Sequence, residues 1–108
     1  MRLHVFPHSP NAIKVLATAY QVGVPFEGVL VDLLKGAQKS AAFTTLNPNQ
    51  KMPVLEDDGF VLWESNAIAQ YLAAKDPDGG LWPRDPCRQA DVSRWHCRRK
   101  RWWTMRTR

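Results

Sequence analysis

The chain has 108 residues, 44% of them hydrophobic and 23% charged, which is the composition of a globular protein able to bury one core. Its formal net charge is +5, but residues 1–93 hold eight Lys/Arg and all ten Asp/Glu, whereas residues 94–108 hold seven Lys/Arg and no acid. The high isoelectric point therefore belongs to residues 94–108, called the basic tail below, and the body is mildly acidic. No apolar run has the length of a signal peptide or a membrane span, so we expect a cytoplasmic protein with no membrane partner.

The first segment has the pattern of a strand followed by a helix. Residues 2–6 form a short apolar strand candidate. Ser9 and Pro10 follow, and these are the residue types preferred at the N-cap and at the first position of a helix. We expect the helix over residues 12–21, with Gly23 at its C-terminal end.

The spacing of apolar residues in this helix predicts which face is buried, and a second strand follows the helix. The three-and-four spacing selects Ile13, Leu16, Ala17 and Tyr20. Residues 26–31 then return as a strand, and a strand, helix and strand in this spacing form a parallel βαβ unit. Residues 38–46 are expected to hold a short, weak helix.

A hairpin and a second helix make up the centre of the chain. Pro53 to Glu56 and Phe60 to Trp63 are strand candidates, joined by Asp57-Asp58-Gly59, which has the residue types of a tight turn. Ser65 is the predicted N-cap of a helix reaching about Lys75, with Ile68 and Leu72 on its apolar side. Trp63 and Tyr71 are expected in the core.

The end of the chain is organised differently. Residues 76–80, DPDGG, have linker composition, and Asp85-Pro86 could start a further helix running to about residue 96. We therefore expect one domain over residues 1–80, followed by a connector and the start of a helical segment over residues 81–108. Cys87 and Cys97 have no Cys-x-x-Cys spacing, which favours reduced thiols.

The central sequence NPNQKMPVLEDDGFVLWESNAIAQYLA resembles the glutathione-binding segment of soluble glutathione transferases, in the group that includes the theta, phi and nu-like classes. The resemblance extends from about Arg2 to about Arg94. It implies an α/β fold with a mixed sheet, a thioredoxin-like βαβ–ββα domain, in which the matching proline, Pro53, follows a cis peptide bond. It also implies that the family's helical second domain is truncated here.

The resemblance implies a catalytic role for Ser9. A redox enzyme of this fold would have its nucleophilic cysteine there, so Ser9-Pro10-Asn11-Ala12 excludes dithiol chemistry. The Ser9 hydroxyl would instead donate a hydrogen bond to the glutathione sulfur, aided by the positive end of the helix. Asn11 is a second candidate for the same contact. The alternative is that Ser9 only caps the helix.

Two further groups of residues would bind glutathione by the same resemblance. The Met52 backbone beside Pro53 would pair with the cysteinyl part, and Lys51 would meet the glycyl carboxylate. Ser65 at a helix start would bind the γ-glutamyl carboxylate, and Glu64 would accept from the ammonium. The alternatives are a solvated lysine and an ordinary helix cap.

The function implied is conjugation of glutathione, as cosubstrate, to a small electrophile, without a bound cofactor or metal and in a homodimer. The histidines have no metal-ligand spacing. Two other functions stay open: a non-catalytic glutathione-binding or dimerising module, and polyanion binding through the basic tail. We expect the tail, with Trp102 and Trp103, to be a truncated or frame-shifted end rather than a nucleic-acid arm.

Overall fold

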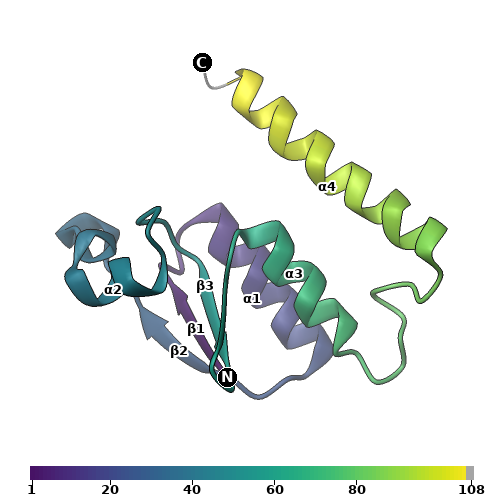
Figure 1. The fold of residues 1–108 in the computed structure, drawn as a ribbon, viewed down its shortest axis with the longest axis horizontal. Helices are drawn as coiled ribbons and strands as arrows, with labels where there is room; N and C mark the ends of the chain where they lie inside the picture. The colour runs from purple at the N-terminus through teal and green to yellow at the C-terminus, as the bar shows by residue number, and fades with distance from the viewer. Residues whose placement is uncertain (107–108) are drawn as a thin grey trace.

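The computed structural model describes the backbone of residues 1–106 and the side chains of residues 1–98. Its centre is one mixed four-stranded sheet of order β2-β1-β3-β4 (Figure 1). The strands are β1 (Arg2–Val5), β2 (Glu27–Leu30), β3 (Val54–Asp57) and β4 (Phe60–Trp63). β1 pairs parallel with β2 and antiparallel with β3, which pairs antiparallel with β4. This arrangement confirms the predicted α/β class and the βαβ–ββα order.

Two helices, α1 (Pro10–Val22) and α3 (Ser65–Ala74), lie side by side over one face of the sheet (Figure 1). Alternate strand residues point to opposite faces, so Leu3 and Leu55, which are paired across β1 and β3, face these helices. Together with Ile68 and Leu72 of α3 they are fully buried. This cluster is the main core, and it fixes the positions of both helix starts.

The buried face predicted for α1 is wrong except at Leu16, which is half-buried against the main core. Ala12, Val15 and Ala19 are buried, whereas Ile13 is 56% and Tyr20 is 73% exposed. Small residues on the inner face let the helix backbone approach the sheet and α3 closely, so the alanines take the core positions. The Tyr20 ring instead packs edge-on against Phe26, with 5.5 Å between the ring centroids.

The opposite face of the sheet is covered by α2 (Ala41–Leu46), which follows two short 3₁₀ turns, η1 (Leu33–Lys35) and η2 (Ala37–Lys39). Ser40 caps α2, because its Oγ accepts a 3.1 Å hydrogen bond from Phe43 N. Phe43 packs with Val31 and Val54 in a second buried cluster. The helix expected over residues 38–46 is thus reduced to its last six residues.

The β3–β4 turn has the predicted chemistry. Asp58 and Gly59 both have positive φ, 50° and 84°, as a two-residue type I′ turn requires. The expectation for Trp63 is wrong, since β4 is an edge strand and Trp63 is 43% exposed. Tyr71 is half-buried and packs against the main core.

A polar cluster ties the hairpin to α3. Tyr71 Oη donates to Asp57 Oδ2 at 2.5 Å, and Lys75 Nζ lies 2.9 Å from the same oxygen. The hydrogen bond from Tyr71, and then that from Lys75, lower the pKa of the Asp57 carboxyl below its usual value. The pKa values of Tyr71 and Lys75 are raised, in each case chiefly by the hydrogen bond to Asp57.

The last helix, α4 (Pro86–Arg106), is longer than predicted, because it continues past residue 96. It is held against α3 by polar contacts: Gln70 Nε2 donates to Ser93 Oγ at 3.2 Å, and Asn66 Nδ2 donates to the His96 carbonyl at 3.3 Å. Farther along, the Arg98 guanidinium lies 5.7 Å from the Trp95 ring centroid. The prediction that the tail is a truncated or frame-shifted end concerns mainly residues 99–108, whose side chains lie outside the described residues.

Within the described residues, no helix combines the length and the hydropathy of a membrane span. No three His, Cys, Asp or Glu side chains there are grouped as metal ligands would be. Cys87 and Cys97 are exposed free thiols.

Candidate functional site

The predicted site residues lie on three segments, and the backbone of Phe6 connects two of them. Phe6 N donates to Met52 Sδ at 3.3 Å, and Phe6 O accepts from Ser9 N at 3.0 Å. The end of β1, the start of α1 and the loop before β3 therefore meet. This loop, residues 47–53, is called the cis-proline loop below, because the Met52–Pro53 peptide bond is cis.

The start of α3 lies at the same end of the domain. Lys14 Nζ, one turn into α1, donates to Asn66 Oδ1, the second residue of α3. The two helices accordingly run in the same direction, with their N-termini next to one another (Figure 1). Each N-terminus has unpaired backbone N–H groups and a partial positive charge. Asn66 also holds α4 through His96, so three helices are joined here.

Ser9 occupies the N-cap position of α1 with extended backbone angles, φ −79° and ψ 136°. Its carbonyl accepts the first helical hydrogen bond from Ile13 N at 3.0 Å. Its hydroxyl, however, makes no capping hydrogen bond, so the expected side-chain cap is absent. Asn11 is exposed on the first turn.

The cis-proline loop presents its predicted residues in different environments. Lys51 is exposed, Met52 is half-buried against both core clusters, and Pro53 is buried. Gln50 has φ 56°, a left-handed conformation that glycine adopts more easily. The backbone at the position before Lys51 is therefore one that would suit glycine.

Glu64 has the most unusual backbone of the candidate site, with φ 81° and ψ 110°. It is Glu64, and not Ser65, that occupies the N-cap position of α3, so the predicted cap is one residue off. Ser65 is the first helical residue and is 7% exposed. A strained conformation held by its surroundings is common at ligand sites, because it directs groups that an unstrained backbone would turn away. Here it occurs at Glu64, the residue directly before the first helical residue of α3.

Sequence reasoning missed the residues that support these segments. Asn47 is a buried amide inside the cis-proline loop, and Lys14 and Asn66 join the two helix starts. Asn47-Pro48 indicates a turn, but no local pattern shows that the asparagine is buried. The Lys14–Asn66 contact spans 52 residues and has no signal in the sequence.

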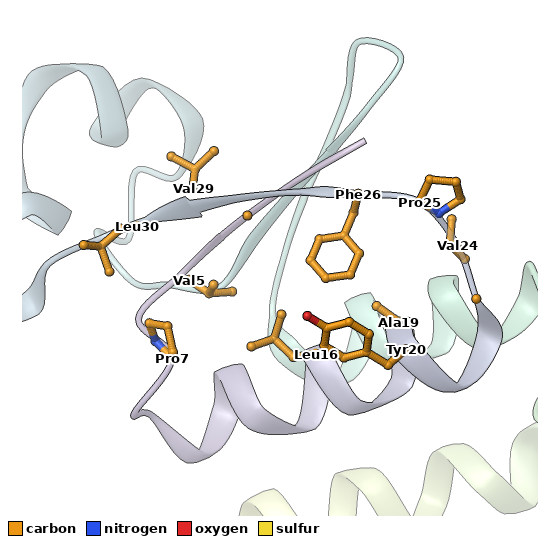
Figure 2. A pocket seen from close by; sticks show the side chains of 12 residues that line it. Val5, Pro7, Leu16, Ala19, Tyr20, Val24, Pro25, Phe26, Val29 and Leu30 are labelled. Carbon is orange, nitrogen blue, oxygen red and sulfur yellow. The ribbon is translucent and has the colours of Figure 1, made fainter.

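A separate groove lies between α1 and β2 and holds none of the predicted site residues. Figure 2 shows the side chains that line it. The volume of the groove is about 690 Å³. Phe26, Tyr20 and Leu30 line its sides, and Gly28 adds no side chain. Its surfaces are mostly apolar.

The arrangement combines two positive helix ends with the cis-proline loop, which meets the start of α1. One helix end suits a thiolate and the other a carboxylate, and a short extended peptide could pair with the segment before Pro53. A mixed four-stranded sheet in this order, with two helices on one face, defines a thioredoxin-like domain.

Comparison with known proteins gives the family. The model of the glutathione S-transferase N-terminal domain matches residues 1–74. The chain is 40% identical to glutathione S-transferase GstB of Escherichia coli over 90 residues, which is 82% of this chain and 43% of that protein. It is 37% identical to glutathione S-transferase D7 of Drosophila melanogaster over 93 residues, 84% of this chain and 42% of that protein. The chain therefore belongs to the glutathione S-transferase N-terminal domain family.

Solved structures agree. A diazinon-metabolizing glutathione S-transferase of the silkworm Bombyx mori aligns with a TM-score of 0.82 and 36% identity, over 89% of this chain and 48% of that one. A delta-class glutathione transferase of Nilaparvata lugens aligns with a TM-score of 0.80 and 40% identity, over 86% and 44%. The chain thus spans less than half the length of these relatives.

Proposed function

We propose that this chain binds glutathione and activates its thiol for attack on a small electrophile, as the glutathione-binding part of a glutathione transferase. Its relatives are named glutathione S-transferases. A glutathione transferase homologue from Sulfitobacter, described with bound glutathione, aligns with a TM-score of 0.73 and 29% identity over 82% of this chain and 43% of that one. Glutathione is the cosubstrate in this proposal, and no other cofactor is needed.

The proposed binding mode assigns one part of glutathione to each segment. The γ-glutamyl carboxylate binds at the start of α3, with Ser65, and its ammonium binds Glu64. The cysteinyl backbone pairs with the Met52 backbone in an extended, strand-like contact. Lys51 meets the glycyl carboxylate as an exposed ion pair.

Ser9 is the proposed catalytic residue, and the observation that carries this role is its hydroxyl, which makes no capping bond although it lies at a helix N-terminus. There it can donate a hydrogen bond to a sulfur anion. Lowering a thiol pKa by about two units takes roughly 2.7 kcal/mol. One charge-assisted hydrogen bond of about 1.5–3 kcal/mol together with the helix end can supply this. Asn11 is the second candidate for this contact.

The proposed reaction is a substitution or addition by the thiolate. The thiol proton leaves to solvent, and a carbon–sulfur bond then forms at the electrophile. In a substitution a leaving group departs with the bonding electrons, whereas in an addition the electrophile takes up a proton. Binding as a homodimer and a cytoplasmic location are part of the same proposal.

The binding mode is tested by calorimetric or NMR titration of glutathione into the purified chain. The Ser65→Ala variant should weaken binding roughly tenfold to a hundredfold, because a hydrogen bond to a charged group is lost. Ser93→Ala is a matched control on α4, since it removes a hydroxyl that bonds to Gln70 away from the candidate site. Equal affinity in the wild type and the Ser65 variant would contradict the assignment.

A further inference from the structure

Asn47 is 2% exposed, and its side-chain hydrogen bonds stay within the cis-proline loop. Its Nδ2 donates to the Lys51 carbonyl at 2.7 Å. Its Oδ1 accepts from the backbone N and from the Nδ2 of Asn49, both at 3.0 Å. Its own backbone N donates to Phe43 O and thereby ends α2, which fixes Asn47 to a packed helix.

The bond to the Lys51 carbonyl controls the next peptide group. The Lys51 carbonyl and the Met52 N–H belong to one planar peptide unit, and this bond is trans, since the cis bond of the loop is the next one. In a trans peptide the C=O and N–H point in opposite directions. Asn47 therefore holds the Met52 N–H so that it points away from the buried amide.

Other contacts do not replace this restraint. The bond from Phe6 N anchors the Met52 side chain, through its sulfur, and leaves the peptide free to rotate. Gln50 N donates to Asn47 O at 2.9 Å, which closes the turn before Lys51. Among the contacts of the described residues, the Asn47 amide is the one that sets the plane of the Lys51–Met52 peptide.

We infer that Asn47 is a positioning residue for glutathione, acting through the Lys51–Met52 peptide on the cysteinyl part of the ligand. This inference rests on the function proposed above. A loop whose Met52 N–H is already oriented loses less conformational freedom when the extended ligand pairs with it. Asn47 itself is buried and touches no ligand in this scheme, so its effect is confined to the part of glutathione that meets Met52.

The test compares two ligands in the full chain by NMR titration. Glutathione needs the cysteinyl contact, whereas γ-glutamylethylamide keeps only the γ-glutamyl end and lacks the cysteinyl carbonyl. Asn47→Asp preserves the shape but replaces the donor by an oxygen that repels the Lys51 carbonyl. We expect the affinity for glutathione to fall roughly tenfold and that for γ-glutamylethylamide to stay within about twofold.

Asn49→Ala is the matched control. It removes one bond accepted by Asn47 Oδ1 but leaves the bond to Lys51, so both affinities should stay close to wild type. If Asn47→Asp does not fold, hydrogen exchange of the wild type carries the test: the Asn47 side-chain amide should exchange more slowly than that of Asn49, and more slowly still with saturating glutathione.

The possible results separate the two claims. Wild-type protein that binds neither ligand overturns the proposed function. If the wild type binds glutathione and a folded Asn47→Asp variant binds it equally well, the inference alone is overturned. An equal loss of affinity for both ligands also overturns it, because that result indicates general loosening of the domain. An Asn47 amide that exchanges as fast as that of Asn49 also overturns it.

Discussion

Ser9 and Ser40 occupy the same helix position and differ in what their hydroxyls do. Ser40 Oγ accepts a hydrogen bond from Phe43 N, whereas the Ser9 hydroxyl makes no such bond. A serine at an N-cap is usually explained by stability. The capping role therefore does not account for the Ser9 hydroxyl, and activation of a thiol is the role proposed for it here.

This contrast predicts unequal effects of removing the two hydroxyls. Ser40→Ala should lower the free energy of unfolding by about 1 kcal/mol, because a capping bond is lost. Ser9→Ala should cost less than about 0.5 kcal/mol, since no capping bond exists to lose. Urea denaturation of both variants measures this. If Ser9→Ala lowers the free energy of unfolding as much as Ser40→Ala does, Ser9 has a purely structural role.

Lys51 provides a second prediction at this scale. Because its side chain is exposed, an ion pair with the glycyl carboxylate should contribute only about 0–1 kcal/mol. Lys51→Ala should therefore weaken glutathione binding by up to about fivefold and leave binding of γ-glutamylcysteine, which lacks glycine, unchanged. Lys39→Ala, another exposed lysine outside the cis-proline loop, is the control. An equal loss for both ligands would exclude Lys51 as the partner of the glycyl carboxylate.

At the scale of elements, local patterns predicted much of the fold. The Asp58-Gly59 turn, the Gly23 helix end and the parallel βαβ unit follow from residue types whose backbone preferences dominate locally, whereas the mixed sheet came from the resemblance. The buried face of α1 did not follow, because size suggested Ile13 and Tyr20 whereas close packing selects alanines. The choice of the candidate site residues and their roles came from the resemblance. Their support by Asn47 and Asn66 depends on contacts between distant segments, which no local pattern records.

The tie between the β3–β4 hairpin and α3 predicts a dependence of stability on pH. The pKa of Asp57 is lowered in the folded chain, whereas the unfolded chain has the ordinary value of about 3.9. The folded state therefore gains stability above pH 4, and this gain is lost as the pH falls through the depressed pKa. Tyr71 and Lys75 have raised pKa values, so their contribution is lost at the alkaline end, above about pH 10.

Thermal unfolding between pH 2 and pH 7 checks the acidic part. Asp57→Asn should flatten the decline in melting temperature below pH 4, because the carboxylate that must be protonated is gone. Asp58→Asn removes the same charge from the neighbouring turn position and leaves the bonds to Tyr71 and Lys75 intact, so its decline should match the wild type. Identical curves of melting temperature against pH for all three proteins would show that the contacts of Asp57 with Tyr71 and Lys75 do not contribute to the loss of stability in acid.

At the scale of the whole molecule, the proposed glutathione contacts lie between Ser9 and Ser65, and the excess positive charge lies after residue 93. α4 contacts α3 through Ser93 and His96, before most of that charge. The two properties are therefore separable in the chain. This separation also distinguishes glutathione binding from the rival interpretation of the tail as a polyanion-binding arm.

Deletion of residues 99–108 tests the separation. Glutathione affinity should stay within about twofold of the full chain, because Asn66 and His96 remain. Any affinity for heparin should fall, and its salt dependence should weaken, because released counterions drive such binding. Fluorescence titrations at two salt concentrations measure both. A large loss of glutathione affinity would mean that the deleted residues support the candidate site.

The central claim is that the Ser9 hydroxyl stabilises the thiolate of bound glutathione. The most direct measurement is the ultraviolet absorbance of the thiolate against pH, with glutathione bound to the wild-type chain and to the Ser9→Ala and Asn11→Ala variants. We predict a lowered thiol pKa in the wild type and a rise of about one to two units in Ser9→Ala, with little change in affinity. A thiol pKa equal to that of free glutathione in the wild type, or one unchanged in both variants, would contradict the claim and leave a glutathione-binding module without catalysis.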